Sequence, residues 1–500
     1  MNFKPEIKEI SLVDNVFSKS VNEVVQGDVI VPDILEDVGK ILTADAEAVI
    51  ESKEISGGRV TVSGTVSADI LYVPQSGGID AIHTKMGFSH TEKAEDDSMN
   101  ISARCRVNSV DYSLYNSRKM NIRTNLGIEI SGTRNINTGV LSSVESDCPV
   151  EIQSRTIEAV SKHVHASDVI PFRETLDIPS GSPAAASVLK CSAVFSDRDF
   201  RLLANKAVIR GNLVISVLYK GEDGELAKAE FTKAITEITD APGAEENMKE
   251  NIFVALSPFT AEPTANAEGA MRAFMTEGKL FVETDCEKCE TESIITDMFC
   301  TGCDLKLTDS PIAAERCEEV TMLAVVRDIV PSEEIKAKRI FDTSVKAAVD
   351  SISVSDGEIT VSGKANAEML VLGNDGTYAS KSRSIPFTYS GAWDKETPSV
   401  TAEAKGVSAV LTGIGDAEIR FTAALSAKTR PGKKESCITN AEVAENSAAA
   451  ERPSLVVYFT KPGDTLWSIA KRYGVTRKNI ISANSHGDTH PEGQKIIIPR

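Results

Sequence analysis

The chain has 500 residues and a mass of 53.6 kDa, too long for one hydrophobic core, because single cores stop growing near about 250–300 residues. Its 41% hydrophobic and 25% charged residues are ordinary for folded proteins and exclude wholesale disorder. A formal net charge of -19 argues against a nucleic-acid partner, because phosphate binding needs clustered Lys and Arg.

The N-terminus and the cysteines indicate the compartment. The first residues, MNFKPEIKEISLVD, contain acids and no apolar segment, so they do not form a signal peptide. No stretch approaches the about 18–20 apolar residues that span a bilayer. The nine cysteines are an odd number spread over a long chain, which is a poor disulfide framework. We therefore predict a cytoplasmic protein without a transmembrane segment.

Three segments share one pattern of alternating apolar residues: RVTVSGTVSADILYV (59–73), KAVIRGNLVISVLYK (206–220) and EITVSGKANAEMLVL (358–372). A period of two predicts a strand with one buried face. A glycine recurs inside each segment, at Gly64, Gly211 and Gly363, and predicts a bulge or a bend.

The repeat extends beyond these strands. A proline precedes each glycine by 32 residues, a glycine-containing turn follows each strand, and an aromatic residue follows each turn. These marks are Pro32, Pro179 and Pro331; the turns at 76–78, 221–225 and 373–376; and Phe88, Phe231 and Phe387. We infer three homologous units spaced 147 and 152 residues apart. We expect the marks to set backbone and core rather than a binding site.

The predicted fold class is mainly β. Antiparallel strands with one apolar and one polar face favour three β-sandwich or open-barrel-like units. We expect the units to span 1–150, 151–311 and 312–436. A linker of small and polar residues at 437–454 and a small α+β domain at 455–500 complete the chain.

Catalytic side chains are scarce. There are six histidines, no GxxxxGK[ST] phosphate loop and no GxSxG nucleophile elbow, so we predict neither an enzyme nor a cofactor. His163 and His165 could share one face of a strand with Asp168 nearby, but we expect exposed polar residues there. An enzyme with its catalytic domain hidden in the β units is the weakest alternative.

Four cysteines form two CxxC pairs, Cys286 with Cys289 and Cys300 with Cys303. This spacing is typical of a zinc ribbon. The flanking segments, however, alternate as strands, in which residues three apart point to opposite faces. A zinc site therefore requires both pairs to lie on tight turns, and we do not include a metal in the prediction.

The C-terminal 46 residues predict a βααβ unit. Val456–Thr460 is the first strand, and Asp464 or Thr465 caps a helix that ends at Gly474. Thr476 caps a second helix that ends at Asn484, and Lys495–Pro499 is the closing strand. The inward side chains are Leu466, Ile469, Ala470, Ile480 and Ala483, and Trp467 is expected to pack in the same core.

GDTLWSIAKRYGV (463–475), Asn484 and GQKIIIP (493–499) closely resemble the LysM family, which binds N-acetylglucosamine glycans such as peptidoglycan. The resemblance implies a groove between the first strand–helix loop and the loop before the last strand. On this chain those loops hold Gly463, Asp464, Thr465, Leu466, Pro491 and Glu492. Where the family usually places apolar residues, this chain has SHGDTHPE (485–492), so half of the implied groove is polar.

The repeated units, with their VSG…ILY strand, preceding proline and following aromatic, resemble the SPOCS domain of sporulating Firmicutes. SPOCS repeats followed by one LysM module resemble the SipL-like spore morphogenesis proteins of clostridia. The resemblance implies a non-enzymatic scaffold for the spore coat, made in the mother-cell cytoplasm and placed on the forespore surface. Its implied partners are the coat morphogenetic ATPase of the basement layer, other coat proteins, or further copies of itself.

The alternative function is a wall or cortex protein that binds peptidoglycan through LysM. The absence of a signal peptide favours the scaffold over this alternative. Residues 455–500 carry seven Lys and Arg against three Asp and Glu, a net of +4, which leaves -23 for the rest of the chain. A basic module on an acidic chain predicts an acidic partner surface.

Overall fold

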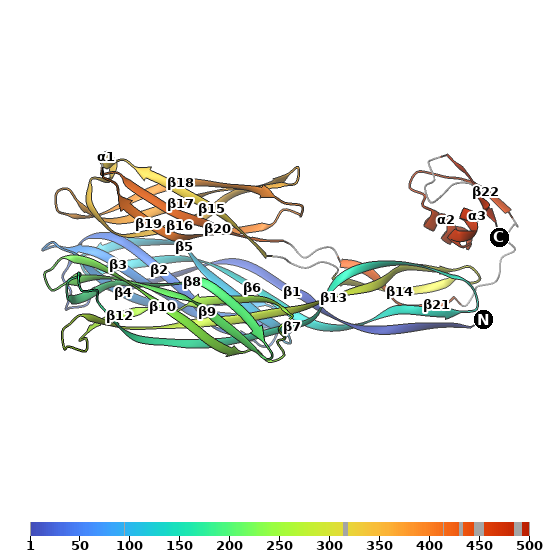
Figure 1. Ribbon diagram of the computed structural model, residues 1–500, viewed down its shortest axis with the longest axis horizontal. Helices are drawn as coiled ribbons and strands as arrows, with labels where there is room; N and C mark the ends of the chain where they lie inside the picture. Colours follow the sequence, from blue (N-terminus) through green and yellow to red (C-terminus); the bar gives the residue numbers. More distant parts are fainter. Residues whose placement is uncertain are drawn as a thin grey trace.

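The structure is a computed structural model that describes residues 2–94, 96–313, 319–413, 415–429, 434–444, 455–484 and 493–499. The protein is mainly β, as predicted, and elongated (Figure 1). Sandwich units form a broad body, paired strands extend from it as a stalk, and a small module with two helices lies beside the end of the stalk. Among the described residues, no helix has the length and apolar character that a membrane crossing requires.

The first unit is a sandwich of two antiparallel sheets with strand orders β1–β6–β5 and β2–β3–β4. Alternating residues of β3, such as Val60, Val62 and Val66, face the second sheet and are fully buried. The strands are β1 (Phe3–Ile30), β2 (Val38–Ile55), β3 (Arg59–Pro74), β4 (Asp80–Lys93), β5 (Asn100–Asn116) and β6 (Lys119–Ser146).

The second unit repeats this arrangement with sheet β10–β9–β8 against a sheet in which β13 pairs with β7, β11 and β12. Two short strands, β11 and β12, here pair with β13 as the single β5 pairs with β6 in the first unit. The strands are β7 (Val150–Asp177), β8 (Ala185–Leu203), β9 (Lys206–Gly221), β10 (Leu226–Asp240), β11 (Lys249–Leu256), β12 (Thr260–Thr264) and β13 (Ala273–Cys300).

The third unit has sheets β15–β20–β19 and β16–β17–β18. Residues 437–443, which we expected in a linker, form the end of β21 and pair with β14. The elements are β14 (Leu305–Ala313), β15 (Glu319–Val330), α1 (Ser332–Ile335), β16 (Ala337–Ser355), β17 (Glu358–Gly373), β18 (Tyr378–Ala392), β19 (Ser399–Leu411), β20 (Ala417–Lys428) and β21 (Lys434–Val443).

The repeat includes its irregularities. In every unit, the strand that precedes the glycine-containing strand (β2, β8 or β16) carries three register shifts. Two of the three lie at matching positions, 147 and 152 residues apart. One such set lies between Ile41 and Thr43, Val188 and Lys190, and Ile340 and Asp342. The third shift lies opposite the recurring glycine, which confirms the predicted bulge. A Cβ on Gly64 or Gly363 would collide with a backbone carbonyl and a phenylalanine ring, so only glycine fits.

The aromatic residue of the repeat packs in the core of every unit, but it does not cover the glycine in every unit. Phe88 and Phe387 cover the glycines of the first and third units, but Phe231 does not cover Gly211. The ring against Gly211 belongs to Phe195 of β8, on the other side of the glycine strand. The core volume is therefore filled from a different strand, which a fixed offset along the sequence does not reveal.

The stalk also contains one ribbon from each unit. The outer halves of β1 and β6, the outer halves of β7 and β13, and the pair β14–β21 run side by side (Figure 1). Their buried residues form a common core: Ile10, Leu12, Val140, Ile157, Ala159, Ile294, Ile312 and Cys437. The chain passes between units at the tip of this stalk, through turns at 147–149 and 301–304.

The body contains a second meeting point of all three units. Three triads of homologous residues, each spaced 147 and 152 residues apart, lie in one cluster, which we call the axial cluster: Leu42, Leu189 and Phe341; Leu71, Leu218 and Leu370; Ile79, Leu226 and Tyr378. Because matching positions meet, the units are arranged as a pseudo-trimer within one chain.

Candidate functional site

The C-terminal module folds as its sequence predicts. Its elements are β22 (Leu455–Phe459), α2 (Leu466–Tyr473), α3 (Arg477–Ala483) and β23 (Lys495–Pro499). Thr465 caps α2 through a reciprocal pair of hydrogen bonds with Ser468, and Gly474 ends the helix at a positive φ of 61°. Its core contains Leu466, Ile469, Ala470, Val475, Ile480, Ile496 and Ile498.

Asn484 joins the second helix to the closing strand. Its amide nitrogen donates to the Ile480 and Ile497 carbonyls at 2.7 and 2.6 Å. Its amide oxygen accepts from the Ile497 N–H at 2.8 Å. These three hydrogen bonds from one side chain hold the end of α3 against β23, so Asn484 has a structural role in the module.

The structure describes half of the predicted groove. Gly463 has a φ of 83° and open space around it, and Thr465 is exposed at the start of α2. Leu466 is buried in the core of the module, with 7% of its surface accessible. Pro491 and Glu492, the other predicted groove residues, lie outside the described residues.

Asp464 is committed to the module itself. Its carboxylate accepts from the Tyr458 hydroxyl at 2.6 Å and from the Lys461 backbone N–H at 2.8 Å. These hydrogen bonds lower the pKa of Asp464, so it is ionised at neutral pH. The side-chain oxygen of Thr465 is likewise engaged by the N–H of Ser468. The polar side chains in this half of the groove are therefore already paired.

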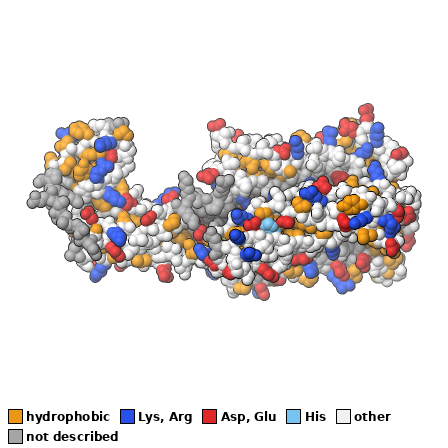
Figure 2. All heavy atoms as spheres, turned by 180° about the vertical axis from the view of Figure 1, so that it is seen from behind, with side chains coloured by type: hydrophobic (Ala, Val, Ile, Leu, Met, Phe, Trp, Pro, Cys, Tyr) orange, Lys and Arg blue, Asp and Glu red, His pale blue; other side chains and the backbone are white. Residues whose placement is uncertain are grey.

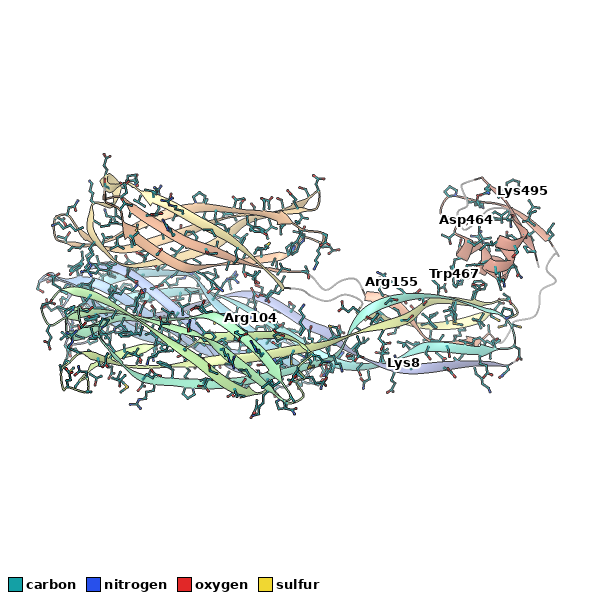
Figure 3. The ribbon with its side chains drawn as sticks, in the orientation of Figure 1. Lys8, Arg104, Arg155, Asp464, Trp467 and Lys495 are labelled. Atoms are coloured by element: carbon teal, nitrogen blue, oxygen red, sulfur yellow. The ribbon has the colours of Figure 1, made fainter. Side chains whose placement is uncertain are left out.

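We expected Trp467 to pack in the core of the module. It contacts that core, but it also contacts the stalk. It lies on the side of α2 that faces the stalk (Figure 3). Its ring meets Phe299 of β13 edge to face at 5.2 Å, and its indole N–H donates to Asp297 at 2.8 Å. Phe299 is only 6% exposed, so the module and the ribbon share a small apolar contact.

Two cations of the module complete this contact. Lys471 bonds to Asp297 at 2.5 Å, and the guanidinium of Arg477 donates to Glu151 of β7 at 2.9 Å while lying 5.2 Å from the centre of the Trp467 ring. The Arg477 backbone N–H also donates to Glu151, at 3.2 Å. We call Trp467, Lys471 and Arg477 the helical face. Figure 2 shows Lys and Arg side chains on the module, and both acidic and basic side chains on the stalk beside it.

The axial cluster continues into a charged network. Lys190 lies 3.0 Å from both Asp45 and Asp342, which belong to the other two units. Lys346 also pairs with Asp45, and Lys228 with Asp342. Burial opposes the charge of Lys190, but the two carboxylates outweigh it and raise its pKa well above the usual value. A single lysine thus connects all three units.

The four cysteines of the CxxC pairs do not form one site. Cys286 and Cys289 lie within the strand β13 rather than on a turn, and Cys300 ends the same strand. Fourteen residues of extended strand separate Cys286 from Cys300 by roughly 45 Å. Burial raises the pKa of Cys286 to about 11. In the described part of the chain, no three His, Cys, Asp or Glu side chains are grouped as metal ligands.

His163 and His165 share a face, as predicted, but they are not exposed and their partner is not Asp168. His165 lies 2.7 Å and His163 3.4 Å from Asp285 on the neighbouring strand. Burial works against ionisation of Asp285, but the hydrogen bonds from both histidines outweigh it and lower its pKa. Asp168 instead accepts from the Val169 N–H. The three side chains form one polar group between the paired strands β7 and β13.

Neither of two hollows in the described body is an enclosed pocket: one is very small, and the other, of about 500 Å³, lies open to solvent. In the described residues, the crevice beside Lys190 and Asp342 has a volume of about 10 Å³, near the minimum for one water molecule. A second hollow, beside Glu396 and Ser399, is open to solvent. These shapes favour contacts on outer surfaces over an enclosed ligand site.

Comparison with known families agrees with this architecture. The family model described as "SipL, SPOCS domain" matches residues 37–115 and 184–263, and the LysM domain model matches residues 458–499. The two SPOCS segments span β2–β5 and β8–β12. The third unit lies outside the matched segments but has the same sheet order and corresponding bulges. No curated protein matches the chain.

The fold and the module define the class: a protein of repeated β-sandwich units that ends in a small carbohydrate-binding-type module. More particularly, the chain carries two segments that match the SPOCS domain of SipL and a C-terminal segment that matches the LysM domain. Both matched families are non-catalytic binding domains, and LysM is a peptidoglycan-binding family.

Proposed function

We propose that the protein is a non-enzymatic scaffold for the spore coat, localised to the forespore surface by a contact between its LysM module and a protein of the coat basement layer. One observation carries this proposal. The side-chain oxygens of Asp464 and Thr465 are bonded inside the module, while the helical face is built for a protein surface, because it already packs on one.

The body suits a scaffold because its three units are joined through one buried cluster and leave large outer surfaces exposed. We propose that its units divide at the tip turns, 147–149 and 301–304, a few residues from the boundaries expected at 150 and 311. Acidic and basic side chains are interspersed over its surface (Figure 2), which suits several weak contacts with coat proteins or further copies of the chain. We place the protein in the mother-cell cytoplasm.

The second candidate is a peptidoglycan-binding protein of the wall or cortex, which the LysM match itself favours. It requires a groove completed by Pro491 and Glu492. Under this second candidate, binding to glycan rather than to a protein determines where the chain is located.

Two purified chains separate the candidates: the full chain, and a matched chain that ends at residue 444. Each is sedimented with insoluble peptidoglycan and, separately, tested for binding to the purified coat basement-layer ATPase. The scaffold predicts that only the full chain binds the ATPase and that neither sediments with glycan. Sedimentation of the full chain alone, without ATPase binding, would replace the scaffold with the second candidate.

A further inference from the structure

The module touches the stalk through its helical face rather than through the predicted groove. The ribbon presents Asp297 and Phe299, two residues apart on one strand, and Glu151 beside them on the paired strand. All three contact the module, through Trp467, Lys471 and Arg477. The carboxylate and the aromatic ring of one strand, and a carboxylate of the paired strand, thus contact the indole and the two cations of the helical face.

The ribbon is shaped for this contact. A register shift between Ile295 and Asp297 interrupts its pairing with β7. Ile295 and Met298, on either side of this bulge, are both buried in the stalk, whereas Asp297 and Phe299 meet the module. A bulge redirects side chains out of the regular alternation. Within residues 295–299, the strand therefore contributes side chains both to the core of the stalk and to the contact with the module.

We propose that the helical face is a recognition surface for an extended strand that presents a carboxylate and an aromatic ring two residues apart, and that the chain's own ribbon occupies it. A partner strand of the same chemistry competes with the ribbon for this face. The inference rests on the proposed function only in its choice of a protein partner. It assigns that partner a site separate from the glycan groove.

When the ribbon occupies this face, the apparent affinity of the face for any other ligand is lower. A module whose face is free one-tenth of the time binds a partner with an apparent Kd about tenfold weaker than a free module. The contact is small and its cations are almost half exposed, so it opens far more easily than the body unfolds. A partner strand therefore has to bind the helical face strongly enough to displace the ribbon.

Trp467 reports this contact directly, because the chain has only two tryptophans and the other, Trp393, is buried in the third unit. In a Trp393→Phe background, acrylamide quenching of Trp467 is measured in the full chain. Asp297→Lys and, independently, Lys471→Glu are expected to increase quenching several-fold and shift the emission to the red. The pair Asp297→Lys with Lys471→Asp restores the ion pair but not the hydrogen bond from the indole, so it is expected to return both values part of the way to those of the parent.

Two matched controls make the same charge changes elsewhere. Glu290→Lys lies on the same strand as Asp297, and Lys478→Glu lies on α3, beyond the contact. Both are expected to leave Trp467 unchanged. If quenching in the parent chain equals that in both Asp297→Lys and Lys471→Glu, the face is open in the free protein and the inference fails, whatever the module binds in the cell.

The chemistry of the partner is tested in trans. The probe is a synthetic hairpin in which residues 293–300, with Cys300→Ser, are joined by an Asn-Gly turn to residues 150–155. It is expected to bind the Asp297→Lys chain at least about tenfold more tightly than the parent chain. A hairpin with Asp297→Asn and Phe299→Ala is expected not to bind. Equal binding to both chains, or to neither, overturns the proposed recognition.

Discussion

The axial cluster and the docked end of the stalk both join folded parts of one chain, but they use opposite means. At the axis, homologous residues of the three units are buried together, and Lys190 pairs with carboxylates of both neighbours. At the stalk, one aromatic pair and two ion pairs hold a module whose cations remain almost half exposed.

The difference indicates which joint is permanent. Breaking a buried ion pair leaves an unpaired charge out of water, whereas a surface ion pair contributes little. The three units should therefore unfold together, and the module should move or unfold by itself. The predictions below test this contrast, from the largest expected effect to the smallest.

Replacing Lys190 with Met should have the largest effect, a loss of about 3 kcal/mol in the free energy of unfolding of the body, because Asp45 and Asp342 lose a shared cation. Urea denaturation followed by circular dichroism measures it. Lys206→Met in the same unit removes an exposed pair with Asp240 and should change stability by less than about 0.5 kcal/mol. Equal effects of the two variants would contradict a special role for the axis.

Gly64→Ala should cost the body about 2–3 kcal/mol, because the new Cβ would press on the Val49 carbonyl and on the ring of Phe88 at 2.9 Å. Gly87→Ala is the matched control, since nothing lies within 4 Å of its Cβ position. The same denaturation experiment compares them. A Gly64→Ala chain as stable as Gly87→Ala would show that the bulge can relax.

Asn484→Ala should destabilise the module alone by about 2 kcal/mol, because two hydrogen bonds to β23 and one to the carbonyl of Ile480 in α3 are lost. Thermal unfolding is followed by Trp467 fluorescence for the module and by the strand signal for the body. Asn479→Ala, an exposed position on the same helix, should be near neutral. A parallel loss of stability in the body would contradict the independence of the module.

Asp285→Asn should have the smallest effect, about 1–2 kcal/mol at pH 7, and should change the pH dependence. The folded pKa of Asp285 lies below its unfolded value near 4, so its contribution is present above about pH 4 and is lost as the pH falls through the folded pKa. The variant should lack this part of the acid decline in denaturation midpoints between pH 5 and 2. Asp168→Asn should retain it.

The repeat and the small module could be predicted because their signals are local. Alternation around Gly64 and the capping pattern at Thr465 are determined by neighbours in sequence, and both are confirmed. The three units, the mainly β fold and the SPOCS and LysM resemblance follow from the same patterns.

The rest depends on contacts between distant residues. Nothing near Lys190 in sequence indicates that it meets Asp45 and Asp342, and Trp467 meets Phe299 across 168 positions. Phe195 of β8 covers Gly211, whereas Phe88 and Phe387 of the opposite neighbouring strands cover Gly64 and Gly363, and this difference depends on the packing of each unit. The expected linker was too long because residues 437–443 merge with the small and polar residues that follow them in sequence, and only pairing with β14 shows that they form a strand.

The ribbon β14–β21 has a mechanical consequence. If the module holds the protein to a surface, a load on the body pulls on Val443 at the tip, while β14 continues toward the body at its opposite end. The two strands are then pulled past each other along their length, so the hydrogen bonds of the ribbon share the force instead of opening one by one. A tether loaded in shear resists detachment better than one that unzips, and the pairing of residues 305–313 with 434–443 provides that geometry.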